Sequence, residues 1–320
     1  LDIESDGQEE ISQILESTLC HTNYQGNRFG RTTLQPRSLG SLLAEGFCRS
    51  TRQLAKESDF VDQNMARRFN LRTIVRMAQC TLEVVEGLRT RASPIGIVDI
   101  LLHTFNTAVI QQLTGRAQEI VRREFETTMG WAKHVQVAPV DFLRLLCPTL
   151  QEQLRESRLY ILDATNTPTR FKFAQAVALC ISCNKPILLE GPPAAGKTAL
   201  VEVLSRPEMG ATNRPLMRVN NTDTTSLHDY FGTYLPEASP GSSGIPEFVF
   251  CPGALTVAMT EGLWFLSDEI NLADPSILSA LAPVLEGAQS VMIPNTSIVV
   301  QIKEGFRFFA TQNDSRFAGR

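Results

Sequence analysis

Hydrophobic residues change their spacing along the chain, and the change separates two regions. Over residues 37–128 they recur at steps of three and four, which predicts a series of helices. A weaker helical spacing covers residues 8–20, and the polar, glycine-containing residues 21–40 after it predict a loop. Few alternating β-branched runs occur in this region, so we predict an α-helical domain over residues 1–150.

Beyond residue 158, strand-like and helix-like segments alternate. Short apolar runs predict strands at residues 186–190, 215–219, 263–268 and 306–312. Helical spacing predicts helices at residues 171–183, 198–205, 253–261 and 274–286. This order predicts an α/β domain over residues 151–320, with a parallel sheet in a three-layer arrangement of helix, sheet and helix.

Two segments interrupt this alternation. Residues 235–252 are rich in Pro, Gly and Ser and are interpreted as an insert. Residues 290–303 carry apolar stretches on either side of Pro294-Asn295-Thr296, which predicts a hairpin with its turn at those three residues.

The clearest motif is a phosphate-binding loop. Residues 191–198 read Gly-Pro-Pro-Ala-Ala-Gly-Lys-Thr between a predicted strand and a predicted helix, which is the context this motif requires. Its glycines allow backbone N–H groups to point at phosphate oxygens, and the helix adds its positive amino end. Lys197 is expected to contact the β- and γ-phosphates of ATP, and the Thr198 hydroxyl to ligate Mg²⁺. The residues predicted to hold the nucleotide are Gly191, Pro192, Pro193, Ala194, Ala195, Gly196, Lys197, Thr198 and Ala199.

The predicted strand at residues 263–268 ends in two carboxylates, Asp268 and Glu269. Such a pair is by itself an ordinary solvated strand end, but ligands gather at the carboxyl ends of parallel strands. Downstream of a phosphate loop, Asp268 is predicted to hold Mg²⁺, directly or through water, and Glu269 to polarise the attacking water. Asn313 follows the last strand, where it either holds that water, contacts the γ-phosphate or only caps the strand.

Composition and charge narrow the choice of function. The 320 residues are 43% hydrophobic and 20% charged, which is typical of a protein with large buried cores. The net charge is −4, so no direct nucleic-acid binding is predicted. The local arginines fall within one helical pattern and are interpreted as a solvated helix face; they are Arg67, Arg68, Arg72 and Arg76. No apolar run reaches membrane-spanning length, and the acidic amino end is unlike a signal peptide, so no membrane partner is predicted.

The seven cysteines are scattered, which predicts a reducing intracellular compartment. Cys180 and Cys183 form a C-x-x-C, but no second Cys or His pair stands at ligand spacing. Packing within a buried helix is therefore favoured over a zinc or redox site. Because the chain starts without Met and stops abruptly at Arg320, we expect it to be a piece of a longer protein.

Several further segments accompany the phosphate loop between Pro186 and the end of the chain. They are Arg218–Asn220, Thr224–Gly232, Glu247-Phe248, Gly253–Leu255, Asp268–Ala273, Ile293-Pro294 and Phe309–Asn313. Together they resemble the large domain of dynein-related AAA+ ATPases, most closely a midasin-type module. By this resemblance Lys197 and Thr198 belong to Walker A. Asp268 and Glu269 belong to Walker B, and Asn313 is sensor 1.

The resemblance implies an ATPase module in a tandem AAA+ ring that remodels protein complexes. Its implied partners are neighbouring AAA+ modules and protein clients. For a midasin-type protein these clients are assembly factors removed from precursors of the large ribosomal subunit, in the nucleus. Residues 235–252 would be the insert in helix 2, and residues 290–303 the hairpin before sensor 1, which face the pore or substrate in the family. The alternatives are a MoxR-like or other dynein-related chaperone, and a nucleotide-binding scaffold that does not hydrolyse ATP.

The helical region is similar to the small lid domain of a preceding module. Phe69–Arg76 either begins a lid helix with Arg72 as sensor 2, or is an ordinary amphipathic helix start. Two departures from the family pattern are Asn313-Asp314 in place of Asn-Pro, and Ala318-Gly319-Arg320 in place of Gly-Gly-Arg. The arginine finger and this module's own lid are expected beyond Arg320, so the isolated chain is expected to hydrolyse ATP slowly.

Overall fold

The chain divides into two compact units, Leu1–Asp141 and Phe142–Arg320. In the computed structural model, the residues described are 5–20, 36–58, 61–62, 68–89, 97–130, 142–143, 168–206, 215–237 and 247–313. The domain boundary predicted at residue 150 lies outside them and stays a prediction. Among the helices of this described part, none combines the length and the hydrophobicity needed to cross a bilayer.

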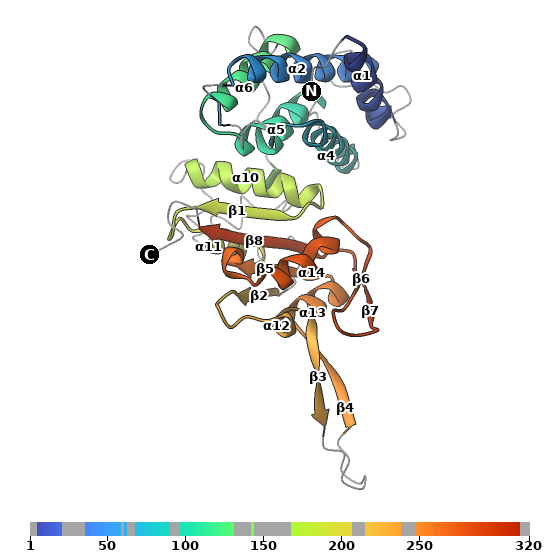
Figure 1. Ribbon diagram of the computed structural model, residues 1–320, viewed down its shortest axis with the longest axis vertical. Helices are drawn as coiled ribbons and strands as arrows, with labels where there is room; N and C mark the ends of the chain where they lie inside the picture. Colours follow the sequence, from blue (N-terminus) through green and yellow to red (C-terminus); the bar gives the residue numbers. More distant parts are fainter. Residues whose placement is uncertain are drawn as a thin grey trace. The chain divides into compact units, whose positions relative to one another are not determined.

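The first unit consists of helices, which confirms the predicted helical region (Figure 1). They are α1 (Ser5–Cys20), α2 (Pro36–Lys56), α4 (Leu71–Arg89), α5 (Ile97–Ala108), the 3-10 helix η1 (Ile110–Gln112) and α6 (Gly115–Met129). Each buries one apolar stripe in a shared core, as amphipathic helices do. Aromatic rings pack at its centre, where the ring centroids of Phe105 and Phe125 lie 4.6 Å apart.

The predicted loop at residues 21–40 overlaps the helical region predicted from residue 37. Residues 36–40 belong to α2, so the loop prediction is wrong at its carboxyl end and the helical prediction is confirmed there. Leu39 is buried, with 2% of its surface exposed. Gly40 approaches α1 so closely that a Cβ atom there would lie 2.5 Å from Cγ of Glu16. The first turn of α2 is therefore stabilised by packing on α1, which local polarity does not reveal. Residues 21–35 lie outside the described part of the chain.

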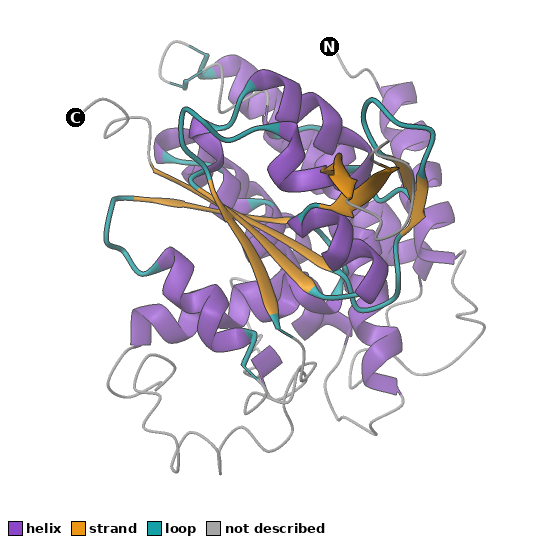
Figure 2. Ribbon diagram, turned by 90° about the horizontal axis from the view of Figure 1, so that it is seen from below, coloured by secondary structure: helices purple, strands orange, loops and turns teal. Residues whose placement is uncertain are grey.

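The second unit is built on a parallel sheet with the strand order β1-β8-β5-β2. The strands are β1 (Ile187–Gly191), β2 (Leu216–Asn220), β5 (Trp264–Asp268) and β8 (Arg307–Asn313). Each lies within one residue of its predicted bounds. Figure 2 shows these strands fanning out with the twist that parallel sheets adopt. The predicted α/β class with a parallel sheet is confirmed.

The helices of the second unit also match the predicted segments. They are α10 (Pro168–Ser182), α11 (Lys197–Leu204), α12 (Leu227–Phe231), α13 (Ala254–Glu261), the 3-10 helix η4 (Ile270–Leu272) and α14 (Pro275–Leu285). Of these, α12 and η4 were not predicted, since five or fewer residues give no periodicity to detect. Every residue of β5 is buried, which explains its continuous apolar run. This strand therefore positions Asp268 from the middle of the core.

Two antiparallel hairpins extend the fold. The predicted hairpin at residues 290–303 is confirmed as β6 (Ser290–Met292) paired with β7 (Val299–Gln301). The segment predicted as an insert also contains strands, because β3 (Gly232–Glu237) pairs with β4 (Glu247–Pro252) and extends away from the sheet (Figure 1). At its base Gly232 has φ 103°, and a Cβ atom there would lie 2.3 Å from the carbonyl oxygen of Cys251. Only glycine fits this turn into the hairpin.

Candidate active site

The predicted site residues meet at the edge formed by the carboxyl ends of the parallel strands. Strand pairing places Gly191 opposite Asn313, and Asn220 opposite Asp268. Because β8 lies between β1 and β5, Asn313 stands between the phosphate loop and the carboxylate-bearing strand. The fold therefore brings the three predicted motifs together, although they are far apart in the sequence.

The phosphate loop joins β1 to α11 through residues with left-handed backbone angles. Ala194 and Gly196 have φ values of 60° and 80°. The loop side chains at residues 192–195 are exposed, and Ala199 is half-buried in the first turn of α11. The N–H groups at the start of a helix have no partners within the helix, so they are available to an anion. A Cβ atom on Gly196 would lie 3.2 Å from Nη1 of Arg170, so this exposed arginine borders the loop.

Lys197 begins α11 and turns its ammonium group back toward the end of β1. Its Nζ donates to the carbonyl oxygens of Gly191 and Pro192, both at 2.9 Å. It also donates to Oδ1 of Asn313 at 3.1 Å. The structure thus brings the predicted lysine and the predicted sensor asparagine into direct contact. These acceptors are neutral, and phosphate oxygens would be stronger acceptors for the same ammonium group.

Asp268 ends β5 and is buried, with 4% of its surface exposed. Its Oδ1 accepts hydrogen bonds from the hydroxyl of Thr198, at 2.9 Å, and from the hydroxyl of Thr311 on β8. Its Oδ2 accepts a hydrogen bond from Nη2 of Arg218 on β2. A carboxylate offers about four lone-pair positions. The donors present among the described residues occupy three of them and leave one position on Oδ2.

This arrangement fits Mg²⁺. The proton of the Thr198 hydroxyl is directed at Asp268, so the lone pairs of its oxygen remain available to a cation. The vacant position on Oδ2 of Asp268 can accept a water molecule bound to that cation. Mg²⁺ prefers oxygen ligands of this kind and retains several waters. Thr198 and Asp268 are thus the residues that could hold the metal.

Glu269 directly follows Asp268 and has a left-handed backbone, with φ 52°. Its N–H donates to Oγ1 of Thr311 at 3.0 Å, which holds this conformation in place. For a residue other than glycine, such a conformation costs about 1–2 kcal/mol and is often found where function requires it. The turn keeps the half-buried Glu269 next to Asp268 at the carboxyl edge instead of continuing the strand. The position suits a base that acts on water near the phosphates.

A buried hydrogen-bond network holds the carboxyl ends of β2 and β5 together. Asn221 donates to the carbonyl oxygen of Asp268 from its backbone at 3.0 Å and from Nδ2 at 2.7 Å. The Tyr230 hydroxyl donates to Oδ1 of Asn221 at 2.8 Å and contacts Oγ of Ser267 at 2.6 Å. Burial raises the pKa of Tyr230, so its hydroxyl stays protonated as a donor. The network locks the ends of β2 and β5 together and fixes the position of Asp268.

Sequence reasoning missed the donors that surround Asp268. Thr311 appeared only within the last strand, and Arg218 and Arg170 had no assigned role. A signal did exist for Thr311, because it lies two residues before Asn313 and so shares its side of the strand. Arg218 could be found only once β2 was known to pair with β5.

The other predicted residues belong to other elements of the chain. Arg72 lies in the first turn of α4, where its side chain is exposed, and its role as sensor 2 stays a prediction. Arg68 and Arg76 are exposed as well, as expected for a solvated helix face. Cys183 is buried and Cys180 is half-buried near the end of α10, and their packing role stays a prediction.

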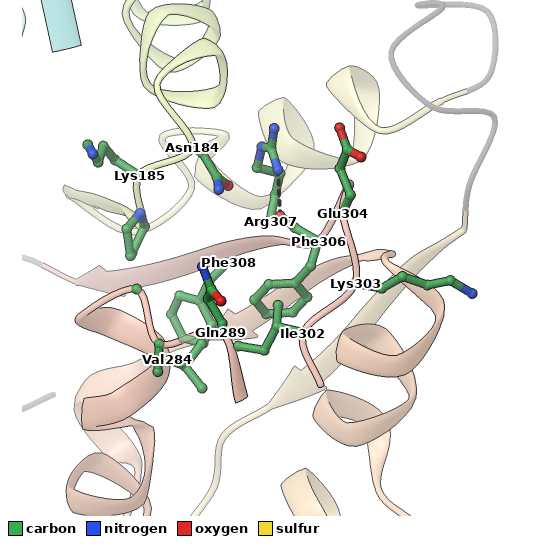
Figure 3. Close-up of a pocket in the computed structure, with 14 residues that line it drawn as sticks. Asn184, Lys185, Val284, Gln289, Ile302, Lys303, Glu304, Phe306, Arg307 and Phe308 are labelled. Atoms are coloured by element: carbon green, nitrogen blue, oxygen red, sulfur yellow. Dashed lines mark hydrogen bonds between the residues drawn. The ribbon is translucent and has the colours of Figure 1, made fainter. Parts of the chain in front are cut away.

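A cavity of about 380 Å³ lies at the amino ends of β1 and β8, opposite the candidate site (Figure 3). Lys185 and Lys303 extend from it in opposite directions. Nε of Arg307 donates to the carbonyl oxygen of Ile181 at 3.2 Å, and Nη1 donates to that of Phe306 at 2.7 Å. Burial lowers the pKa of Arg307 from its usual value. These contacts tie the end of α10 to β8, so the cavity is interpreted as part of the scaffold.

Comparisons with known proteins agree with this geometry. Residues 186–320 match the family model of the AAA domain of the dynein-related subfamily. Midasin of Giardia intestinalis is 35% identical over 166 residues, which cover 52% of this chain and 3% of that protein. Midasin of Dictyostelium discoideum is 38% identical over 133 residues, 42% of this chain and 2% of that protein.

An uncharacterised protein of Staphylococcus saprophyticus is 34% identical over 145 residues, which cover 45% of this chain and 52% of that protein. The chain therefore spans about half of this bacterial relative and a small fraction of the two midasins. The family match covers the sheet and all the motifs at its carboxyl edge. Residues 186–320 thus match the AAA domain of the dynein-related subfamily and are similar to a part of midasin.

Proposed function

We propose that residues 186–320 bind ATP with Mg²⁺ and hydrolyse it. The observation that supports this most strongly is the convergence of four predicted residues at one edge of the sheet. Lys197 contacts Asn313, and Thr198 contacts Asp268. No chance glycine-rich turn would produce both contacts together with the strand order of a phosphate-binding fold.

The roles of the residues follow from their geometry. Lys197 would exchange its carbonyl acceptors for phosphate oxygens. Thr198 and Asp268 would hold Mg²⁺, which when bound neutralises negative charge on the phosphates. Glu269 would accept a proton from the attacking water, and Asn313 would orient that water or contact the γ-phosphate.

We further propose that this module works within a ring of AAA+ modules that remodels protein complexes. The similarity to midasin supports a tandem ring whose clients are assembly factors of the large ribosomal subunit precursor, with a nuclear location. A chaperone of another dynein-related kind is the alternative, since a similar segment also occurs in a staphylococcal protein of which it covers 52%. Native mass spectrometry separates the two, because a ring formed by copies of one short chain excludes the tandem arrangement.

A scaffold that binds nucleotide without hydrolysing it is the second candidate. The complete set of Lys197, Asp268 and Glu269 speaks against it, since loss of any one of them would stop turnover. Single-turnover measurement with labelled ATP distinguishes the two functions. Retention of intact ATP over hours by a protein assembled with its neighbouring modules would favour the scaffold.

The nucleotide assignment is tested by the Lys197→Ala variant and a fluorescent ATP analogue. Binding should be lost because no other ammonium group of the described residues contacts the phosphate loop. Lys303→Ala is the matched control, since Lys303 is exposed at the opposite end of the sheet and should leave the affinity unchanged. Circular dichroism verifies that both variants are folded. Equal affinity of Lys197→Ala and the parent would contradict the proposal.

A further inference from the structure

Arg218 joins two parts of the candidate site that the motifs treat separately. It lies on β2, which pairs with β5. Its Nη2 forms an ion pair with Oδ2 of Asp268, and its Nη1 forms one with Oε1 of Glu202 at 3.0 Å. Glu202 belongs to α11, the helix that begins with Lys197. One guanidinium group therefore connects the predicted metal carboxylate with the helix behind the phosphate loop.

The charge of Arg218 acts on a nearly buried group. The Asp268 side chain is 6% exposed, whereas the side chains of Arg218 and Glu202 are 43% and 44% exposed. A buried carboxylate requires a compensating charge or full hydrogen bonding. Thr198 and Thr311 supply only neutral hydroxyls to Asp268. Arg218 thus supplies the positive charge that faces this nearly buried carboxylate.

The same charge opposes a second cation. The vacant lone-pair position on Asp268 lies on Oδ2, the oxygen that already accepts from Arg218. A divalent cation whose water used this position would share one carboxylate oxygen with a guanidinium. Like charges a few ångström apart repel each other even where one of them is partly exposed to water, as Arg218 is. The phosphates of a nucleotide would bring negative charge that offsets the repulsion between the Arg218 guanidinium and the divalent cation.

We propose that Arg218 sets the metal affinity of the site, so that a divalent cation binds well only together with nucleotide. The inference depends on the proposed function, which assigns Thr198 and Asp268 to Mg²⁺. Arg218 acts through Asp268 and is therefore a positioning residue. Glu202, the other carboxylate paired with Arg218, partly neutralises the guanidinium charge and so weakens its repulsion of the metal ion.

The test uses Mn²⁺, whose free form is counted directly by electron paramagnetic resonance. Titrations compare nucleotide-free protein with its ADP complex. Without nucleotide, Arg218→Gln should bind Mn²⁺ at least about tenfold more tightly than the parent, because one positive charge beside Asp268 is gone. Arg218→Lys keeps the charge and should stay near the parent. Adding Asp268→Asn to Arg218→Gln should abolish the gain.

A second variant has the opposite expected sign. Glu202→Gln leaves the charge of Arg218 unbalanced, so its ADP complex should bind Mn²⁺ more weakly than the parent complex. Because Glu202 is exposed, this variant should fold even if Arg218→Gln does not. Arg218 lines a surface cavity of about 400 Å³ and its side chain is 43% exposed, so its replacement should disturb the apolar core little.

Either of two results overturns the inference: equal or weaker Mn²⁺ binding by folded Arg218→Gln, or unchanged or tighter binding by the ADP complex of Glu202→Gln. Failure of the proposed function would be seen in another experiment. The parent would then not bind the ATP analogue, or the Lys197→Ala variant would bind it as tightly as the parent. The Mn²⁺ titration of nucleotide-free protein does not involve Lys197, so the two failures are distinguishable.

Discussion

The Thr311→Val substitution tests how far the stability of the sheet depends on the candidate site. Thr311 is 1% exposed, and its hydroxyl joins two neighbours. It donates to Oδ1 of Asp268 and accepts from the N–H of Glu269 at 3.0 Å. Valine has nearly the same shape but can do neither. The substitution therefore removes two hydrogen bonds while leaving the packing of β8 almost unchanged.

The expected loss follows from the two broken contacts. A hydrogen bond to a charged group contributes about 1.5–3 kcal/mol, and a buried N–H left without a partner costs about 1–3 kcal/mol. The extra methyl group regains part of this, and Arg218 and Thr198 still bind Asp268. We expect the free energy of unfolding to fall by about 3 kcal/mol. In a domain of ordinary stability this is a large fraction of the total.

Urea denaturation followed by tryptophan fluorescence measures this loss. The chain has two tryptophans, and Trp264 lies in β5 beside the site, so a Trp131→Phe background reports on the sheet. Thr260→Val is the control, because Thr260 is exposed and its hydroxyl donates only to carbonyl oxygens of the preceding helix turn. The control should shift the free energy of unfolding by less than about 0.5 kcal/mol. A loss below about 1 kcal/mol in Thr311→Val would refute the assigned hydrogen bonds.

Three further predictions concern other parts of the second unit. Glu269→Gln should keep the affinity for ATP and slow its single-turnover hydrolysis at least about a hundredfold, since the amide cannot accept a proton, and an unchanged rate would exclude Glu269 as the base. Gly232→Ala should lower the melting temperature clearly more than Gly287→Ala, because both have positive φ but only the first Cβ meets a backbone oxygen; equal shifts would contradict the clash. Hydrogen bonds from Ser276 lower the pKa of Asp274 in the folded protein. The ionised carboxylate therefore stabilises the fold at pH values above the unfolded pKa of about 4, and this stabilisation is lost as the pH falls through the lower pKa of the folded state. The advantage in melting temperature of the parent over Asp274→Asn, which keeps the cap but does not titrate, should therefore shrink below about pH 4, and a constant difference would contradict this.

The sheet and the phosphate loop could be predicted because their signals are local. A strand buried on both faces is apolar over most of its length, as β5 is from Trp264 to Leu266, and the loop needs glycine where φ is positive, as at Gly196. The β3–β4 hairpin gave no such signal. Its Tyr234, Leu235 and Phe248 are exposed, so no buried face imposes an alternating pattern on the sequence.

The surroundings of Asp268 could not be predicted for a different reason. Its donors come from α11, β8 and β2, and only the strand order β1-β8-β5-β2 makes them neighbours. Local periodicity establishes that a strand exists, but it does not determine which strand lies beside it. The sequence therefore predicts the ligand of the metal and leaves the residues that orient it unknown.

This difference determines how variants of the site are to be interpreted. Asp268 accepts three hydrogen bonds in the absence of any ligand, so its replacement disturbs the contacts of α11, β8 and β2 at once. A loss of ATP hydrolysis in such a variant would report fold and chemistry together. Lys197 contacts carbonyl oxygens and one amide, and its removal leaves no buried charge without a partner. Lys197 therefore isolates nucleotide binding, whereas conclusions drawn from Asp268 require a parallel measurement of stability.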